Sequence, residues 1–274
     1  MKIGMAGASM MMTGWKDAIK AAADLGYDCI ELFLEFPQTE TDQISQAERE
    51  QAKKLARDLK LEIAGHAPFN SLNLAAFNRG IREESVRQSI EAVRFVSDLG
   101  GATVIIHNGD YIIDAAWGPA ADTGMGIQWD LNLDSLKRVA ETAEQRGVYL
   151  CLENCNFVGY KIDRNLDDLM EIKNEVNSPN LKFNLDIGHS RLAEGVGNAI
   201  KTLGEDIRHI HFTDNFGKND DHLIIGAGNF DYQPFLYFIK RFPYIVTLEA
   251  IKIDSSLETP KKSLENFRKI IQLH

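Results

Sequence analysis

Eight short runs of β-branched and apolar residues alternate with amphipathic helical patterns along this chain, and this alternation constrains its fold most strongly. The expected strands are Lys2–Ala6, Asp28–Leu34, Leu61–His66, Thr103–His107, Val148–Glu153, Leu181–Asp186, Ile207–Phe212 and Tyr244–Glu249. The helical patterns lie near residues 14–25, 43–59, 80–99, 131–146, 165–177, 197–203, 231–241 and 257–272. Eight strand–helix units over about 250 residues are typical of a (β/α)8 barrel. We therefore predict an α/β chain that forms one such barrel over residues 1–274.

The alternation of side chains within the strands favours a closed barrel over an open, doubly wound sheet. In residues 149–153, Cys151 and Glu153 share one face and Leu150 and Leu152 share the other. Other expected strands likewise become polar on one face towards their C-terminal ends, and those ends meet at one mouth in a barrel. An open sheet usually has a glycine-rich first turn, whose fingerprint residues 4–7 do not match.

Composition excludes several other classes of protein. The chain has 30 basic and 40 acidic residues, a formal charge of −10, and therefore no general attraction for nucleic acid or anionic membranes. We find no signal peptide and no apolar run long enough for a membrane span. The odd count of 3 cysteines suits a reducing interior, so we expect a cytoplasmic protein in which Cys151 and Cys155 are packing residues.

Histidines and carboxylates gather at the C-terminal ends of the expected strands or in the loops that follow them. These residues are His66, His107, Glu153, Asp186, His189, His211, Asp220, His222 and Glu249. Imidazoles and carboxylates are the ligands expected for zinc, manganese and similar divalent ions. Each residue alone has a structural explanation, such as a helix cap at Asp186. Burying all of them at one mouth without a metal would be costly, so we predict a metal site.

A further acidic residue, Glu31, lies on the inward face of the second expected strand. Its position predicts a residue that supports the metal ligands or contacts the substrate.

Ordered motifs at the strand ends resemble the xylose isomerase-like TIM barrel superfamily, specifically its sugar phosphate isomerase/epimerase group. The motifs are GHAPF at 65–69, IHNG at 106–109, LEN at 152–154, NLDIGH at 184–189, HIHFTD at 209–214, HLIIGAG at 222–228 and LE at 248–249. They cover nearly the whole chain. They are specific for the superfamily and say little about the individual reaction.

The resemblance implies one divalent ion (Mn, Zn, Co or Mg) and an isomerase or epimerase of a sugar or sugar phosphate. The implied ligands are Glu153, Asp186, His211 and Glu249. Glu153 and Glu249 would also act as acid and base, removing and returning a proton through a metal-stabilised enediolate. The remaining candidates, for substrate or additional metal, are His66, His107, His189, Asp220 and His222. The expected partner is a small sugar or polyol, and such barrels often form homo-oligomers.

The main alternative within the superfamily is an abasic-site endonuclease with up to three zinc ions. Those enzymes use histidines after strands three and four and an Asp-x-His element, which His66, His107 and Asp220–His222 could supply. Their glycine-rich extension after the fifth-strand glutamate is absent at residues 154–159, and no basic loop suits DNA. We therefore expect sugar chemistry and no nucleic-acid partner. Dehydration of a cyclic polyol stays open, whereas the presence of both glutamates disfavours a non-enzymatic binding barrel.

Overall fold

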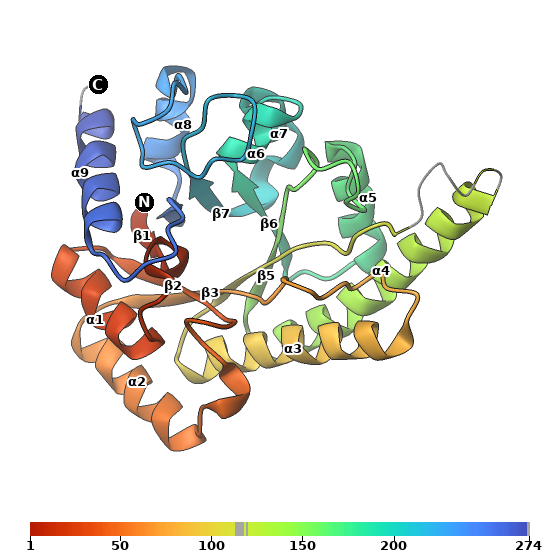
Figure 1. Ribbon diagram of the computed structural model, residues 1–274, viewed down its shortest axis with the longest axis horizontal. Helices are drawn as coiled ribbons and strands as arrows, with labels where there is room; N and C mark the ends of the chain where they lie inside the picture. Colours follow the sequence, from red (N-terminus) through yellow and green to blue (C-terminus); the bar gives the residue numbers. More distant parts are fainter. Residues whose placement is uncertain (113–117, 119, 273–274) are drawn as a thin grey trace.

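A closed parallel barrel forms the centre of the computed structural model, which describes residues 1–112, 118 and 120–272 (Figure 1). Its strands are β1 (Lys2–Ala6), β2 (Cys29–Phe33), β3 (Glu62–His66), β4 (Thr103–Ile106), β5 (Tyr149–Glu153), β6 (Leu181–Asp186), β7 (Ile207–Phe212) and β8 (Ile245–Leu248). Each strand pairs with the next, and β1 closes the ring by pairing in parallel with β8. The predicted (β/α)8 barrel is confirmed.

Helices surround this barrel in the predicted order. They are α1 (Trp15–Leu25), α2 (Gln46–Asp58), α3 (Arg79–Asp98), α4 (Ala120–Arg146), α5 (Leu166–Val176), α6 (Ile187–Leu192), α7 (Val196–Leu203), α8 (Leu236–Arg241) and α9 (Glu258–Gln272). Short 3-10 turns lie at Gly7–Met10, Thr41–Gln43, Gly204–Asp206 and Gln233–Phe235. Within the described ranges, no helix is long and apolar enough to cross a bilayer.

Three helices differ from the prediction, and the one expected near 231–241 is shortened to Leu236–Arg241. The expected helix near 131–146 begins at Ala120, and its first turns project beyond the barrel (Figure 1). This segment lacks a clear apolar period, but buried Gln128 donates to the carbonyl oxygens of Ala75 and Asp110 at 3.2 and 3.1 Å. Such tertiary hydrogen bonds are not visible in a sequence pattern. The short helix α6, which was not predicted, begins where the Asp186 carboxylate accepts a hydrogen bond from the His189 amide.

Apolar side chains fill the space between barrel and helices, where Phe95, Phe183 and Phe267 are fully buried. Burial of each contributes roughly 1.5–3 kcal/mol. Inside the barrel, a small cluster of Cys29, Ala64 and Ile245 forms an apolar floor. Polar residues lie above this floor, towards the C-terminal ends of the strands, as the alternation predicted.

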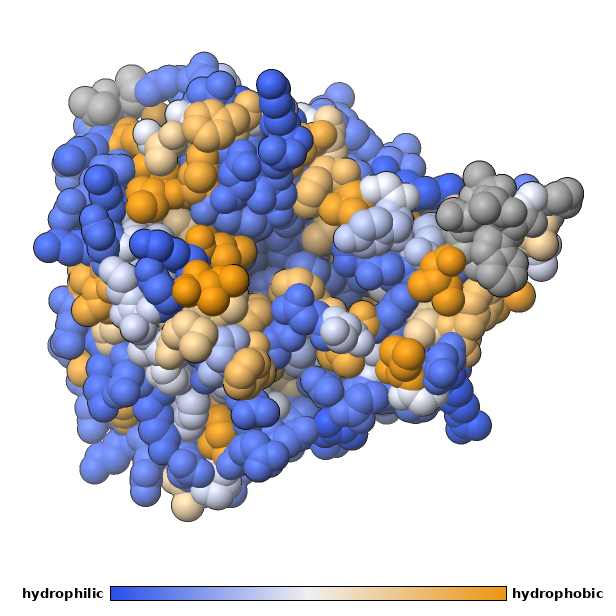
Figure 2. Space-filling model, in the orientation of Figure 1, coloured by the Kyte–Doolittle hydropathy of each residue, from blue (hydrophilic) through white to orange (hydrophobic). Residues whose placement is uncertain are grey.

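The loops at the C-terminal end of the barrel are tied together in pairs. The Lys252 amide donates to the Ala8 oxygen at 3.1 Å, which joins the loop after β8 to the loop after β1. The Ile162 amide donates to the Gly109 oxygen at 3.1 Å, which joins the loop after β5 to the loop after β4. These loops surround the barrel mouth, where Figure 2 shows a deep hollow with a hydrophilic interior.

Candidate metal centre and active site

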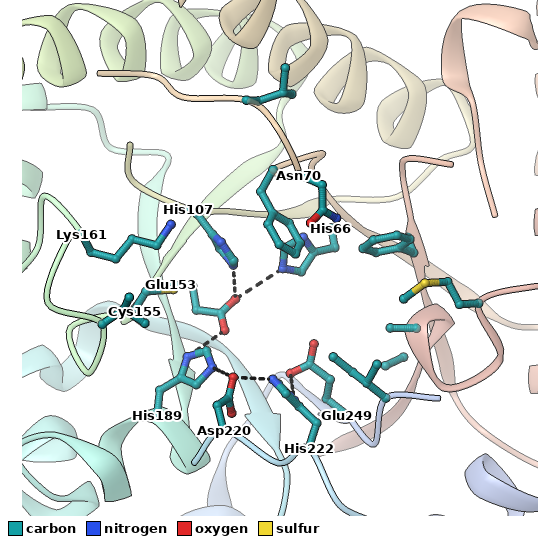
Figure 3. Close-up of a pocket in the computed structure, with 18 of the residues that line it drawn as sticks. His66, Asn70, His107, Glu153, Cys155, Lys161, His189, Asp220, His222 and Glu249 are labelled. Atoms are coloured by element: carbon teal, nitrogen blue, oxygen red, sulfur yellow. Dashed lines mark hydrogen bonds and ion pairs between the residues drawn. The ribbon is translucent and has the colours of Figure 1, made fainter. Parts of the chain in front are cut away.

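A cavity of about 660 Å³ opens at the C-terminal mouth of the barrel. Among its lining residues are His66, His107, Glu153, His189, Asp220, His222 and Glu249 (Figure 3). The two other candidate residues, Asp186 and His211, are fully buried and lie within reach of Glu153 and Glu249. The structure therefore brings together all nine candidates that the strand ends suggested.

The central group, which we call the four-donor centre, consists of Glu153, Asp186, His211 and Glu249. One donor atom from each residue lies within 4.8 Å of the others. The Nδ1 atom of His211 is 3.1 Å from Glu249 Oε2 and 3.4 Å from Glu153 Oε1. Within the described part of the chain, His211 Nδ1, Asp186 Oδ2 and Glu249 Oε2 make no hydrogen bond. Buried polar atoms without partners are costly, so this donor set fits a divalent cation.

The protonation of the four-donor centre also fits a cation site. Burial, together with the nearby carboxylates of Glu153 and Glu249, raises the pKa of Asp186 to about 7. Burial disfavours the charged form of Glu153, but the charge of His211 and hydrogen bonds from His107, His211 and His66 together outweigh it and hold the Glu153 pKa well below its usual range. Burial likewise opposes charge on His211, yet the surrounding carboxylates raise its pKa well above the usual value. Without a cation, the proton on His211 offsets the repulsion among these carboxylates.

A second group joins His66 and His107 to the other oxygen of Glu153. The Nε2 atoms of His66 and His107 lie 3.5 and 3.4 Å from Glu153 Oε2. The His66 Nδ1 atom is 3.0 Å from the Ala67 oxygen, to which it can donate. Burial opposes charge on this ring, but the Glu153 carboxylate raises the pKa of His66. Burial lowers the pKa of His107 to about 4, and this ring is neutral at pH 7. Glu153 therefore bridges the second group and the four-donor centre.

A third group lies on the opposite side of the four-donor centre and consists of His189, Asp220 and His222. Asp220 Oδ2 lies 3.1 Å from His189 Nε2 and 2.8 Å from His222 Nε2 (Figure 3). His222 adopts a left-handed φ of 42°, which residues other than glycine rarely adopt. Burial opposes its charge, but Glu249 and Asp220 raise the pKa of His222 to about 9.

Asn154 fixes the relative position of two strand ends that carry candidate ligands. Its side-chain oxygen accepts from the Asp186 amide at 2.8 Å, and its amide group donates to Ser190 Oγ at 3.1 Å. The Oδ1 atom of Asp186 accepts the His189 amide at 2.7 Å, while its Oδ2 atom stays unpaired among the described residues. Asp186 thus fits both the helix cap and the candidate metal ligand suggested by the sequence. One of its oxygens caps α6, and the other faces the four-donor centre.

Cys155 and Lys161 are two of the lining residues that were not predicted. Cys155 was expected to be a packing residue, but it lines the cavity as well as being buried, and burial raises its pKa to about 12. Its place two residues after Glu153, in the loop, was the available signal. Lys161 is the only lysine or arginine among the described lining residues, and its Nζ lies 2.7 Å from Asp110 Oδ1. No sequence signal marks Lys161, because the pairing of two distant loops brings it to the cavity.

The predicted inward position of Glu31 is also observed. Glu31 is buried, and its carboxylate reaches the Nε2 edge of the His211 ring, which points away from the four-donor centre. Glu31 therefore supports the candidate ligand His211 from below. This is the first of the two predicted roles, support of the metal ligands or contact with the substrate.

Comparison with known proteins identifies a family and several similar sugar epimerases. A family model described as xylose isomerase-like TIM barrel matches residues 19–270. Fructoselysine 3-epimerase of Escherichia coli O157:H7 is 25% identical over 277 residues, covering 99% of this chain and 98% of the relative. A crystal structure of a D-tagatose 3-epimerase-like protein has a TM-score of 0.84 and 25% identity, covering 100% of this chain and 98% of that one.

A second kind of relative is named as an endonuclease. Probable endonuclease 4 of Aquifex aeolicus is 28% identical over 262 residues, covering 89% of this chain and 87% of the relative. Similar proteins therefore include both reaction classes considered from the sequence.

Proposed function

Because the chain belongs to the xylose isomerase-like TIM barrel family, we propose that it is a divalent-metal-dependent isomerase or epimerase of a sugar or sugar phosphate. The observation that carries this proposal is the convergence of buried, unpaired donor atoms in the four-donor centre. The epimerases among its relatives support the same reaction class. The proposed ligands are Glu153, Asp186, His211 and Glu249. A divalent cation bound there would supply a Lewis acid that stabilises negative charge on a substrate oxygen.

The two glutamates are the proposed acid and base. Glu153 and Glu249 come from β5 and the end of β8, and both carboxylates reach the cavity (Figure 3). Burial disfavours their charge, but the neighbouring histidines hold the pKa of each below its usual range, so both are ionised at neutral pH. One carboxylate can take the proton from the carbon next to a carbonyl, and the other can return a proton. Return to the opposite face inverts that carbon, whereas return to the neighbouring carbon isomerises the sugar.

The first experiment is a screen for proton exchange. Protein loaded with Mn, Co, Mg or Zn is incubated in D2O with a panel of ketoses and their phosphates, and NMR follows deuterium entry beside the carbonyl. We expect exchange with at least one sugar, and only in the presence of the cation. The identity of the product separates epimerisation from isomerisation. Absence of exchange with every sugar and cation would contradict the proposal.

A second candidate function, phosphodiester cleavage at abasic sites by a trinuclear zinc centre, is favoured by one specific observation. All three donor groups are complete, and Glu153 bridges two of them. The endonuclease relatives support this alternative. Against it, the described lining residues include a single lysine or arginine, Lys161, which is already paired with Asp110. Few contacts are therefore available for the phosphates of a DNA duplex.

Metal content distinguishes the two candidates. Protein purified without chelators or added metal should hold about one divalent ion per chain for the sugar enzyme and about three zinc ions for the endonuclease. Elemental mass spectrometry gives this number. Asp220→Asn should lower a content of about three ions to about two. The matched control is Asp221→Asn, whose side chain accepts the Phe216 amide outside all three groups and should leave the content unchanged.

His107→Ala adds a functional comparison between the same candidates. If His107 holds a zinc ion together with Glu153, the variant should lose activity on an abasic-site duplex. If one cation in the four-donor centre is sufficient, the variant should mainly weaken the binding of a sugar, with a raised KM. Three bound ions together with cleavage of the duplex would replace the sugar proposal.

A further inference from the structure

A second polar layer lies directly below the four-donor centre, inside the barrel. We call it the lower layer and define it as Glu31, His209, Thr247 and the Nε2 edge of His211. Glu31 Oε1 is 3.1 Å from His211 Nε2, and Glu31 Oε2 is 2.8 Å from His209 Nε2. Thr247 Oγ1 donates to Glu31 Oε2 at 3.1 Å. These residues come from β2, β7 and β8 and are almost completely buried.

The ring of His211 links the two layers through its two nitrogens. Its Nδ1 atom faces the carboxylates of Glu153 and Glu249, and its Nε2 atom faces Glu31. A neutral imidazole carries a hydrogen on one nitrogen and a lone pair on the other. Because the Glu31 carboxylate can only accept, it selects the ring form with the hydrogen on Nε2. The lone pair is then on Nδ1, which points into the four-donor centre.

Glu31, His209 and His211 also lie close enough together to be considered as cation ligands. Their hydrogen bonding argues against that role. Both Glu31 oxygens have hydrogen-bond partners, whereas Asp186 Oδ2, Glu249 Oε2 and His211 Nδ1 have none within the described ranges. The Glu31 carboxylate is thus satisfied by protein groups alone, whereas these three atoms of the four-donor centre are not.

We propose that Glu31 is a positioning residue that holds His211 in the Nε2–H form, so that Nδ1 presents its lone pair to the divalent cation. This inference rests on the proposed function. His209 and Thr247 act through Glu31, because they hold its second oxygen in place. A carboxylate that accepts a hydrogen bond from a metal-binding histidine fixes the ring orientation and increases the basicity of the ligand.

The test measures cation binding by itself. The affinity of the protein for Zn²⁺ and Mn²⁺ is measured by competition with a chelator for wild type and Glu31→Gln. We expect a loss of about 10–100-fold in affinity, because the amide cannot replace the carboxylate as acceptor from Nε2–H with the same strength. The matched control is Glu35→Gln, in the loop after β2. The Glu35 carboxylate accepts hydrogen bonds from the Phe69 amide and the Asn70 side chain and lies outside the lower layer. The affinity of the Glu35→Gln variant for both cations should therefore stay at the wild-type value.

A second measurement needs no variant. Histidine ¹⁵N NMR of the zinc-loaded wild type should show His211 with a protonated Nε2 and a metal-bound Nδ1. A His211 ring that binds through Nε2, or unchanged affinity in a folded Glu31→Gln variant, would overturn the inference. If the wild-type protein binds neither cation, both the proposed function and the inference about Glu31 fail. If wild type binds and only the Glu31 result fails, the proposed function stands.

Discussion

Replacement of Glu249 by glutamine should slow proton exchange at the substrate carbon by about 10²–10⁴-fold, the usual contribution of a positioned acid or base. The amide keeps the size and shape of the side chain but cannot take up a proton at neutral pH. Glu249 is 6% exposed, so water has little access with which to replace it. The rate is measured as deuterium incorporation at saturating metal, which separates proton transfer from weaker cation binding.

Two further variants make this result specific. Glu153→Gln should cause a loss of similar size, because the proposed reaction needs both carboxylates. Glu258→Gln, at an exposed position at the start of α9, should retain wild-type exchange. Turnover at the wild-type rate in metal-saturated Glu249→Gln would show that the two-glutamate mechanism is wrong.

Removal of the cation should lower the melting temperature, and this loss should grow as the pH rises from 5.5 to 8.5. A cation at a hundred times its Kd stabilises the native state by about 2.7 kcal/mol, or about 5–10 °C for a chain of this size. Melting curves with and without a chelator, recorded across this range of pH, check the prediction. We expect the full difference near pH 8.5 and a much smaller one at pH 5.5.

The direction follows from the groups that titrate in this window. Without a cation, burial raises the pKa of Asp186 to about 7, and Glu249 and Asp220 raise that of His222 to about 9 against the effect of burial. A group whose pKa is raised by folding stabilises the native state at pH values below its pKa in the unfolded chain. This stabilisation is lost as the pH rises through its pKa in the folded protein. For each group, the free energy of unfolding of the metal-free protein therefore falls between its pKa in the unfolded chain and its pKa in the folded protein. Loss of the Asp186 proton in this window also frees a ligand oxygen of the four-donor centre and strengthens cation binding.

Carboxylates with a lowered pKa do not reverse this trend. For Glu153, Glu249 and Asp220 burial opposes charge, but neighbouring histidines hold each pKa below its usual range. Their stabilisation is lost only as the pH falls towards these low values, so it is constant above pH 5.5. A chelator-induced loss that narrows with rising pH, or no loss at pH 8.5, would contradict a cation in the four-donor centre.

The predictions that succeeded from sequence depend on short-range regularities. Strand–helix alternation predicts the barrel, and the two-residue repeat predicts which face of β5 points inwards. The C-terminal ends of all strands in a parallel barrel meet at one mouth. Residues such as His66, Asp186 and Glu249 could therefore be assigned to the mouth of the barrel without any knowledge of distances between them.

The remaining features depend on contacts between distant segments. α4 extends back to Ala120, and in this added part Gln128 donates hydrogen bonds to the backbone of two other loops. Lys161 reaches the cavity through the pairing of its loop with the one that carries Asp110.

The sequence by itself determined the barrel, its polar mouth and the residue types that meet there. Only the tertiary structure decided that Glu153 bridges two donor groups and that Glu31 lies beneath His211. The physical reason is that alternation fixes the face of a strand on which a side chain lies. The stagger between strands and the orientation of each side chain then decide which atoms approach within hydrogen-bond distance.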